Sequence, residues 1–435
     1  MKLLGTVTPI PNQQQARAVR PWRKYVAVIT FLIACGVPFI TSQRLIVPID
    51  DVFITLTYAR SVADGDGFRF HPDAEAYFGT TTPLNTIVLA TLHRIAPNIT
   101  LPRLAIIVSA AFWIAHGGLF LRYGDRFGLT SFERLSVAIL TTVMLPKIVI
   151  LGFEYHLLMF LILITFLLYL GGRYRAAGVG IALAYFTRGE GILLFLVLLF
   201  DIIRTHRGGP VTESQSAIFG PTYRILQGML LILIPATILI FFHTGDPLPG
   251  TLSAKIAQVI SFQTHQPFRR EVLAYLNREW APLGYLTVLH SRLNIMPIMA
   301  MGGILLTLLY RPTLSLYLTF LALFSLGYSL LDVAFYGWYT TPIAYILTIF
   351  AALVPHTLYY LQTDVFQLQR PIVRALPGAF AITLTLGMSI SIARFSVPQG
   401  PVQLERNVEY RNLATWFNEN ASEGATIAFF EVGNM

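Results

Sequence analysis

Residues 50–83 read DDVFITLTYARSVADGDGFRFHPDAEAYFGTTTP, and they follow directly after the first long apolar stretch of the chain. Asp50 and Asp51 therefore stand at the boundary between an apolar segment and a polar one. Two adjacent carboxylates at a membrane boundary are costly unless they are solvated, paired or used in chemistry. The pair indicates a reaction or a binding event at a membrane surface.

The composition is that of a polytopic, all-α membrane protein. Of 435 residues, 12% are charged and 55% are hydrophobic, and the mean hydropathy is +0.62. A soluble domain carries about 25% charged residues. The net charge of +9 does not indicate nucleic-acid binding, because the Lys and Arg residues lie between apolar stretches rather than in one stripe.

The apolar pattern predicts about eleven spanning helices, each close to the ~20 residues that a bilayer requires. They are expected at 25–41, 102–121, 134–151, 156–171, 175–187, 190–203, 225–243, 293–310, 313–331, 340–360 and 375–393. The arrangement is a bundle with interfacial helices in its first outer loop.

The short loops between these spans alternate in Lys and Arg content, which sets the orientation because basic loops stay in the cytoplasm. The basic set comprises Arg17, Arg20, Arg23, Lys24, Arg122, Arg126, Arg134, Arg173, Arg175, Arg204, Arg207, Arg224, Arg311, Arg370 and Arg374. The alternation holds only if the short apolar segment 83–96 does not span, so we expect it to lie in the interface. The expected organisation is a cytoplasmic N-terminus at 1–24 and a membrane module at 25–393, with outer loops at 42–101 and 244–292.

The outer side of this topology gathers carboxylates that were not used to set it. Asp50 and Asp51 lie there, together with Glu154 and the turn 187–190, TRGE. Each acidic residue could mark a helix end, and aspartates in a first helical turn favour the helix dipole. Their presence on one face favours a shared polar site.

Three basic residues on the outer side are candidate ligands for an anionic group. Lys255 follows the turn-forming stretch GDPLPGT, and it is either an anion ligand or a side chain that reaches lipid headgroups. Arg188 either binds an anion or pairs with Glu190. Arg60 lies in a helix expected from Asp50 onward, and it fits an ion pair and a phosphate ligand equally well.

The order of these motifs resembles that of the GT-C superfamily of integral-membrane glycosyltransferases. The matching segments are Asp50-Asp51, Tyr58-Ala59-Arg60, Gly65-x-Gly67 and 79–84 in the first outer loop, then Phe153-Glu154, 187–191 and 245–255. Gly189 replaces the proline of the family's Arg-Pro-Glu-Gly turn, and Gly250 replaces the asparagine of its Pro-Asn-Thr…Lys loop. Trp338-Tyr339 stands where an Arg-Tyr pair is common, so one expected cation is missing. The suggested relatives are arabinofuranosyltransferases and mannosyltransferase-like members.

The resemblance implies a sugar donor on a polyprenyl phosphate, and inverting transfer on the non-cytoplasmic face to a glycan, lipid or protein hydroxyl. Such a hydroxyl needs a base, and the family's catalytic aspartate matches Asp50, with Asp51 as the alternative. The leaving phosphate needs fixed cations, for which Lys255, Arg188 and Arg60 are the candidates.

Four further residues have implied roles around the sugar. Glu154 and Glu190 would bind sugar hydroxyls or orient the cations. Trp338 and Tyr339 would stack on a sugar or hold the prenyl chain, or they form an interfacial aromatic belt. No cofactor and no metal ligand set is predicted, although some relatives use a divalent cation.

The tail at 394–435 is expected to begin a small outer α/β segment, with a helix at 404–420 and a strand at 425–432. A lone strand is not a domain, so we expect the sequence to be a fragment.

Two other functions fit the sequence: a transporter or flippase of a lipid-linked or anionic solute, and an inactive scaffold member of the superfamily. A transporter would place its ionisable groups near the midplane of two similar halves; this chain shows neither pattern.

Overall fold

The computed structural model describes residues 31–32, 50–71, 73, 75–144, 152–206, 211–246, 267–276, 285–288, 291–331, 335–354, 412–413, 415–417 and 419–421. The described α-helices are α2 (Asp50–Asp64), α3 (Pro83–Ile95), α4 (Leu101–Tyr123), α5 (Ser131–Met144), α7 (Tyr155–Leu170), α8 (Tyr174–Thr187), α9 (Leu193–His206), α10 (Val211–Thr244), α12 (Phe268–Tyr275), α13 (Ile295–Tyr310), α14 (Ser315–Leu330) and α15 (Thr341–Ala351). Short 3-10 turns are η1 (Gly124–Phe127), η2 (Gly189–Ile192), η5 (Pro312–Leu314) and η6 (Gly337–Thr340).

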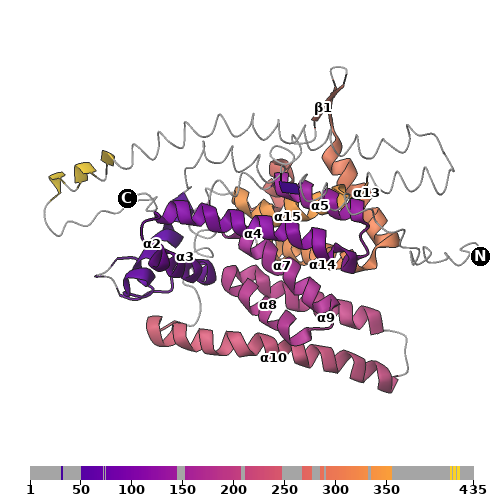
Figure 1. Cartoon of the computed structure of the whole chain (residues 1–435), viewed down its shortest axis with the longest axis horizontal. Helices are drawn as coiled ribbons and strands as arrows, with labels where there is room; N and C mark the ends of the chain where they lie inside the picture. The colour runs from indigo at the N-terminus through magenta and orange to yellow at the C-terminus, as the bar shows by residue number, and fades with distance from the viewer. Residues whose placement is uncertain are drawn as a thin grey trace, which may run out of the picture.

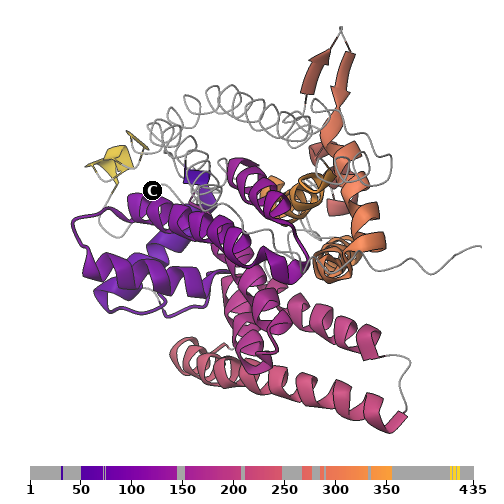
Figure 2. The same cartoon turned by 45° about the vertical axis from the view of Figure 1, so that its right-hand side comes forward.

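The long helices form a bundle around α7 (Figure 1). Helix α7 packs against α4 and α8, α8 packs against α10, and α13 packs against α15. Helices α2 and α3 pair at one end of this bundle, at the left of Figure 1. Figure 2 shows that α10 covers one flank of the bundle and makes its main contact with α8.

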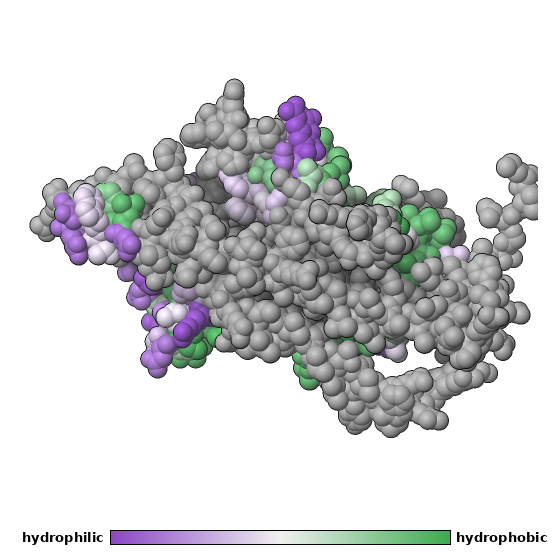
Figure 3. All heavy atoms as spheres, turned by 90° about the horizontal axis from the view of Figure 1, so that it is seen from above, coloured by the Kyte–Doolittle hydropathy of each residue, from purple (hydrophilic) through white to green (hydrophobic). Residues whose placement is uncertain are grey.

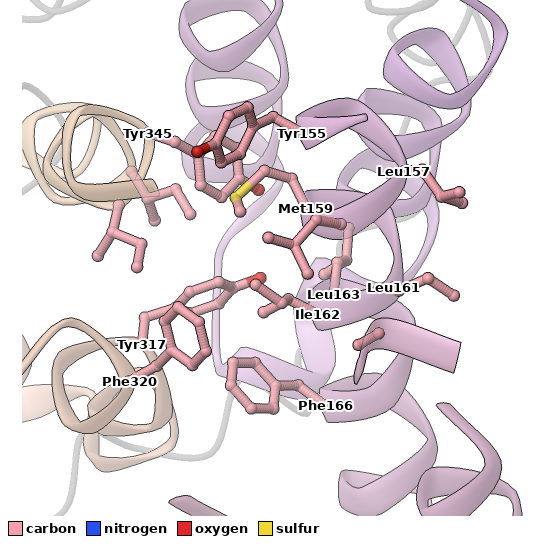
Figure 4. Close-up of a cluster of buried hydrophobic side chains, with 14 of the residues drawn as sticks. Tyr155, Leu157, Met159, Leu161, Ile162, Leu163, Phe166, Tyr317, Phe320 and Tyr345 are labelled. Atoms are coloured by element: carbon pink, nitrogen blue, oxygen red, sulfur yellow. The ribbon is translucent and has the colours of Figure 1, made fainter. Parts of the chain in front are cut away.

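Helix α7 lies at the centre because it is apolar on every side, which is the pattern of a helix buried all round. In Figure 4, Tyr155 and Met159 of α7 point toward Tyr345, whereas Leu157 and Leu161 point away from it. Buried rings also interlock, and the ring of Phe166 meets that of Tyr317 edge-on with centroids 5.0 Å apart.

The protein is an integral membrane protein. Three described helical segments are long and apolar enough to cross a bilayer: Leu101–Phe127, Ala217–Thr244 and Pro312–Leu330. Tyr155–Leu170 and Met296–Tyr310 are apolar but shorter. On the face seen from above in Figure 3, apolar patches lie beside hydrophilic ones, and the hydrophilic ones lie toward the left and the top of the view.

The bounds of one expected span were wrong. Residues 207–224 were expected in a loop before a span at 225–243, but helix α10 already begins at Val211 and continues through Pro221 and Pro235. Proline is tolerated inside membrane helices because neighbouring groups satisfy the backbone carbonyls that it leaves free. Arg224 therefore lies on a helix rather than in a loop.

The region expected as the outer loop 244–292 contains structure that the sequence did not predict. Helix α12 lies in it, and strands β1 (Tyr285–Val288) and β2 (Ser291–Asn294) form an antiparallel hairpin with Leu286 opposite Leu293. The helices expected from Asp50 and at 83–96 are confirmed as α2 and α3. In the tail, residues 412–413, 415–417 and 419–420 are helical, and the strand expected at 425–432 lies outside the described residues.

Arginines gather where several helices of the bundle begin or end. One end, called the arginine end here, holds Arg126, Arg134, Arg204 and Arg311. Arg126 Nη1 donates to the carbonyl of Leu167, and Arg204 Nη2 lies 3.4 Å from the carbonyl of Pro312. These contacts join the ends of α4, α7, α9 and α13. Among the described residues, the basic turns that hold Arg126, Arg204 and Arg311 therefore meet at one end of the bundle.

Candidate active site

Three predicted site residues meet at the opposite end of the bundle. Arg188 ends α8, Glu154 precedes α7, and Glu190 lies in the η2 turn before α9. Arg188 Nη1 donates to Glu154 Oε1 at 2.5 Å, and Arg188 Nε donates to Glu190 Oε1 at 2.7 Å. We call these three residues the triad and this end the triad end.

The triad is buried and carries one net negative charge. The Arg188 side chain is 8% exposed, and those of Glu154 and Glu190 are 5% and 10% exposed. Burial alone would raise the pKa of the Glu190 carboxyl, but the adjacent guanidinium outweighs burial and lowers that pKa. Burial likewise disfavours the charged guanidinium, but the neighbouring carboxylates hold the pKa of Arg188 well above its usual range. Both groups are therefore ionised at neutral pH.

A close backbone approach forms the η2 turn. A Cβ on Gly191 would lie 2.2 Å from the carbonyl carbon of Ala184, so only glycine lets the turn fold back on α8. Gly189, two residues earlier, has open space around it. Gly189 is therefore not required by packing, whereas Gly191 is.

Aromatic side chains frame the triad. The Cζ atom of Arg188 lies 4.5 Å from the ring centroid of Tyr155 and 5.7 Å from that of Tyr339. The Tyr328 hydroxyl donates to Glu190 Oε1 at 3.0 Å. Cations are stabilised over aromatic faces, so the rings hold the guanidinium in place on the sides that the carboxylates leave open.

Trp338 lies next to this group. Its ring stacks on Tyr336 with centroids 4.8 Å apart and lies 5.6 Å from the ring of Phe153, the residue before Glu154. Tyr339 is buried and Trp338 is half-buried. The structure thus brings together five predicted site residues: Glu154, Arg188, Glu190, Trp338 and Tyr339.

Asp50 and Asp51 begin helix α2, and their side chains are outside the described part of the structure. The next residue, Val52, is buried, and its Cγ1 lies 3.6 Å from the position of a Cβ on Gly152. Gly152 stands two residues before Glu154. The first turn of α2 therefore packs beside the chain that enters the triad.

A buried hydroxyl cluster, which the sequence did not reveal as such, holds α2 against α3. Thr82 Oγ1 lies 3.1 Å from Thr55 Oγ1 and 3.3 Å from Thr80 Oγ1, and Thr80 Oγ1 lies 3.3 Å from Thr86 Oγ1. The repeated threonines at 80–82 are the available signal in the sequence, but their spacing does not show that the hydroxyls meet. Buried hydroxyls are stable when they pair with one another, so this cluster fixes the helix that carries Asp50.

The first outer loop is also fastened to the end of α10. The backbone N–H of Phe68 donates to His243 Nε2 at 2.9 Å, and Gly67 lies directly against the same imidazole. Gly67 has a positive φ of 77°, as expected for the turn after α2. The loop after α2 is thus tied to the helix that precedes the Lys255 region.

One predicted cation, Arg60, does not join the triad. Arg60 is exposed on α2 and makes no hydrogen bond or ion pair with another described residue. Lys255 lies outside the described residues. Carboxylates also occur away from the triad end, because Glu133 pairs with Arg311 and Asp201 with Arg204 at the arginine end. The expectation that carboxylates gather on one face is therefore only partly correct.

Solved structures share this architecture. ArnT from Cupriavidus metallidurans bound to undecaprenyl phosphate superposes with a TM-score of 0.62 at 14% identity, over 94% of this chain and 83% of that chain. The same protein in the apo state gives a TM-score of 0.60 at 14% identity, over 92% and 81% of the two chains. The chain has a GT-C fold. No protein-family model matches the sequence, and no curated protein sequence matches it.

Proposed function

We propose that the chain is a glycosyltransferase that moves a sugar from a polyprenyl-phosphate carrier to a hydroxyl acceptor at the triad end. The observation that carries this proposal is the likeness to ArnT bound to undecaprenyl phosphate over 94% of the chain. The grouping of Glu154, Arg188 and Glu190 at one end of that fold supports it. The orientation of this end toward the outside of the cell, and inversion at the anomeric carbon, are part of the proposal.

In this proposal Asp50 is the base that takes the proton of the acceptor hydroxyl, with Asp51 as the alternative. A hydroxyl is a weak nucleophile until a positioned carboxylate removes its proton during attack. The start of α2 lies beside Gly152 and hence near the triad, which is the placement that such a base requires. Glu154 or Glu190 would then accept hydrogen bonds from sugar hydroxyls, and Trp338 would offer a flat apolar surface to a sugar ring.

The contacts of Arg188 favour a positioning role over direct binding of the donor phosphate. Its Nη1 and Nε atoms already donate to carboxylates, and Tyr155 lies against its guanidinium. The triad as a whole is negative, so it would repel a phosphate rather than attract it. Lys255 and Arg60 are therefore the residues proposed to stabilise the growing negative charge on the leaving phosphate, and Arg188 holds the two glutamates in position.

The proposal is tested by sugar transfer in membranes that hold radiolabelled lipid-linked sugars. Membranes would carry the native chain, Asp50→Asn, Asp51→Asn or Asp64→Asn at matched expression. Asp64 is exposed at the far end of the same helix and serves as the matched control. We expect Asp50→Asn to lose about 10²-fold or more of the transfer rate, with Asp64→Asn close to native. Loss in Asp51→Asn alone would move the base by one residue, and silence of the native chain would contradict the enzyme proposal.

The proposed binding of the donor phosphate is tested separately, by measuring how tightly undecaprenyl phosphate binds to the purified chain. Lys255→Met should weaken binding, because it removes a cation from the phosphate, while Arg122→Gln should not. Arg122 is exposed at the arginine end. Equal weakening by both substitutions would indicate only a general effect of charge.

A further inference from the structure

Arg173, Arg175 and Arg224 also lie at the arginine end, since the Gly171 turn before Arg173 lies against Arg126, and they differ from the other arginines there. Arg126, Arg204 and Arg311 each donate to a backbone carbonyl or a carboxylate. Arg173 and Arg224 are exposed, and neither forms a hydrogen bond or an ion pair with any described residue. Among the described residues, Arg175 bonds only to Gln227, with its Nε atom donating to Oε1 at 2.9 Å.

These three arginines line one groove. The groove has a volume of about 440 Å³ and is lined by Gly172, Arg173, Tyr174, Arg175, Ala176 and Arg224. No Asp or Glu is among these lining residues. Like charges that converge without a counter-charge raise the local electrostatic potential and attract an anion.

The packing of α8 on α10 builds the groove. A Cβ on Gly228 would lie 1.9 Å from the carbonyl oxygen of Arg175, and one on Gly178 would lie 2.0 Å from that of Ile225. This glycine contact locks the two backbones together and brings Arg224 of α10 beside the first turn of α8. The Gly171-Gly172 turn opens the other wall, with Gly172 at a positive φ of 69°.

We propose that this groove binds the phosphate of an anionic lipid headgroup. Guanidinium groups match the oxygens of a phosphate in pairs, and the free N–H groups at the start of α8 add further donors. The neighbouring exposed surface of α10 is apolar, with Phe219 69% and Tyr223 63% exposed. Such a surface fits the acyl chains of a lipid whose headgroup enters the groove. The site lies at the end opposite the triad and is independent of the proposed transfer reaction.

The test titrates dioctanoyl phosphatidylglycerol onto the purified full-length chain in a neutral detergent, with bound lipid counted by native mass spectrometry. We expect saturable binding that weakens about fivefold in Arg173→Gln and in Arg224→Gln, which is the change that corresponds to about 1 kcal/mol per arginine. The matched control is Arg122→Gln, because Arg122 is also exposed at this end and stacks on Tyr123. It should bind as the native chain does.

Two further arms identify the source of the phosphate. Dioctanoyl phosphatidylcholine, which has no net charge, should bind more weakly than phosphatidylglycerol. Inorganic phosphate at the same concentration should fail to displace the lipid, and full displacement would assign the groove to free phosphate and overturn the lipid assignment. The proposal is also overturned if Arg122→Gln weakens binding as much as Arg224→Gln, or if phosphatidylglycerol does not saturate.

Discussion

The two ends of the bundle use the same residue types in opposite ways. At the triad end, one buried arginine serves two buried glutamates, and the group is left with a negative charge. At the arginine end, Glu133 and Asp201 each have their own arginine, and arginines outnumber carboxylates. The excess charge is therefore negative and buried at one end, and positive and exposed at the other.

The difference separates what stabilises the fold from what serves a function. At the triad, the adjacent guanidinium outweighs the cost of burying the Glu190 carboxyl, so this buried charge is stable only as long as Arg188 remains beside it. The exposed arginines at the other end cost little and are the pattern expected for loops that stay on the cytoplasmic side. One guanidinium shared by two glutamates distinguishes the triad from the one-to-one pairs at the arginine end, and the following substitutions compare the two ends.

The largest expected effect is that of Arg188→Gln. It leaves Glu154 and Glu190 buried side by side without a counter-charge, and breaking a buried ion pair in this way costs about 3–5 kcal/mol. Arg311→Gln is the matched change at the arginine end, where Glu133 keeps a hydrogen bond of 2.7 Å from the backbone N–H of Thr130. Thermal unfolding of the purified chains, followed by tryptophan fluorescence, should show the greater loss for Arg188→Gln.

Equal losses in the two variants would contradict the contrast between the ends. A second variant is needed because Arg188→Gln could fail to fold, and its stability could then not be measured. Arg188→Lys keeps the charge but cannot bridge both carboxylates in the same fork geometry. It should retain more stability than Arg188→Gln.

The second prediction compares two glycines in the η2 turn. Gly191→Ala places a methyl group 2.2 Å from the carbonyl carbon of Ala184, whereas Gly189→Ala enters open space. Forced overpacking costs about 1–3 kcal/mol, so Gly191→Ala should lower the unfolding temperature and reduce sugar transfer, and Gly189→Ala should change neither. If Gly191→Ala kept the native unfolding temperature and the native rate of sugar transfer, the turn would be able to move away from α8.

The sequence predicted Glu154, Arg188 and Glu190 as members of one polar site because they fall at helix ends and lie in segments that resemble GT-C motifs. It also predicted most helix bounds to within a few residues, since long apolar runs are direct signals of membrane helices. It could not show that Arg188 is shared by both glutamates, because Glu154 is 34 residues away along the chain.

The missed features depend on contacts that are remote in sequence. The hairpin at 285–294 is only four residue pairs long, too short for its alternation to stand out. The early start of α10 was hidden by Pro221, because proline is ordinarily a sign that a helix ends. The groove of Arg173, Arg175 and Arg224 depends on how α10 crosses α8, which no local pattern encodes.

The third prediction concerns pH. Glu190 has a lowered pKa in the folded chain because of Arg188, so its contribution to stability is complete above the ordinary carboxyl pKa of 4.5 and is lost as the pH falls through the lower folded value. The unfolding temperature of the native chain should exceed that of Glu190→Gln by a constant amount from pH 8 to about pH 5. The difference should shrink at lower pH. A difference that already shrinks near neutral pH would mean that Glu190 is not held ionised by Arg188.

The smallest expected effect is at the hydroxyl cluster that joins α2 to α3. Thr82→Val keeps the shape of the side chain but removes the hydroxyl that lies 3.1 Å from Thr55 Oγ1 and 3.3 Å from Thr80 Oγ1. The Thr55 hydroxyl loses this partner in a buried place, which costs about 1–3 kcal/mol, whereas the Thr80 hydroxyl keeps Thr86 Oγ1 and the backbone N–H of Thr82. Because α2 carries Asp50, the same change should reduce sugar transfer more than it reduces undecaprenyl phosphate binding.

Thr91→Val is the control, because Thr91 is an exposed residue of α3 whose hydroxyl donates to the carbonyl of Ile87 within the same helix. If the two variants transfer sugar equally well, the threonine cluster does not position the start of α2.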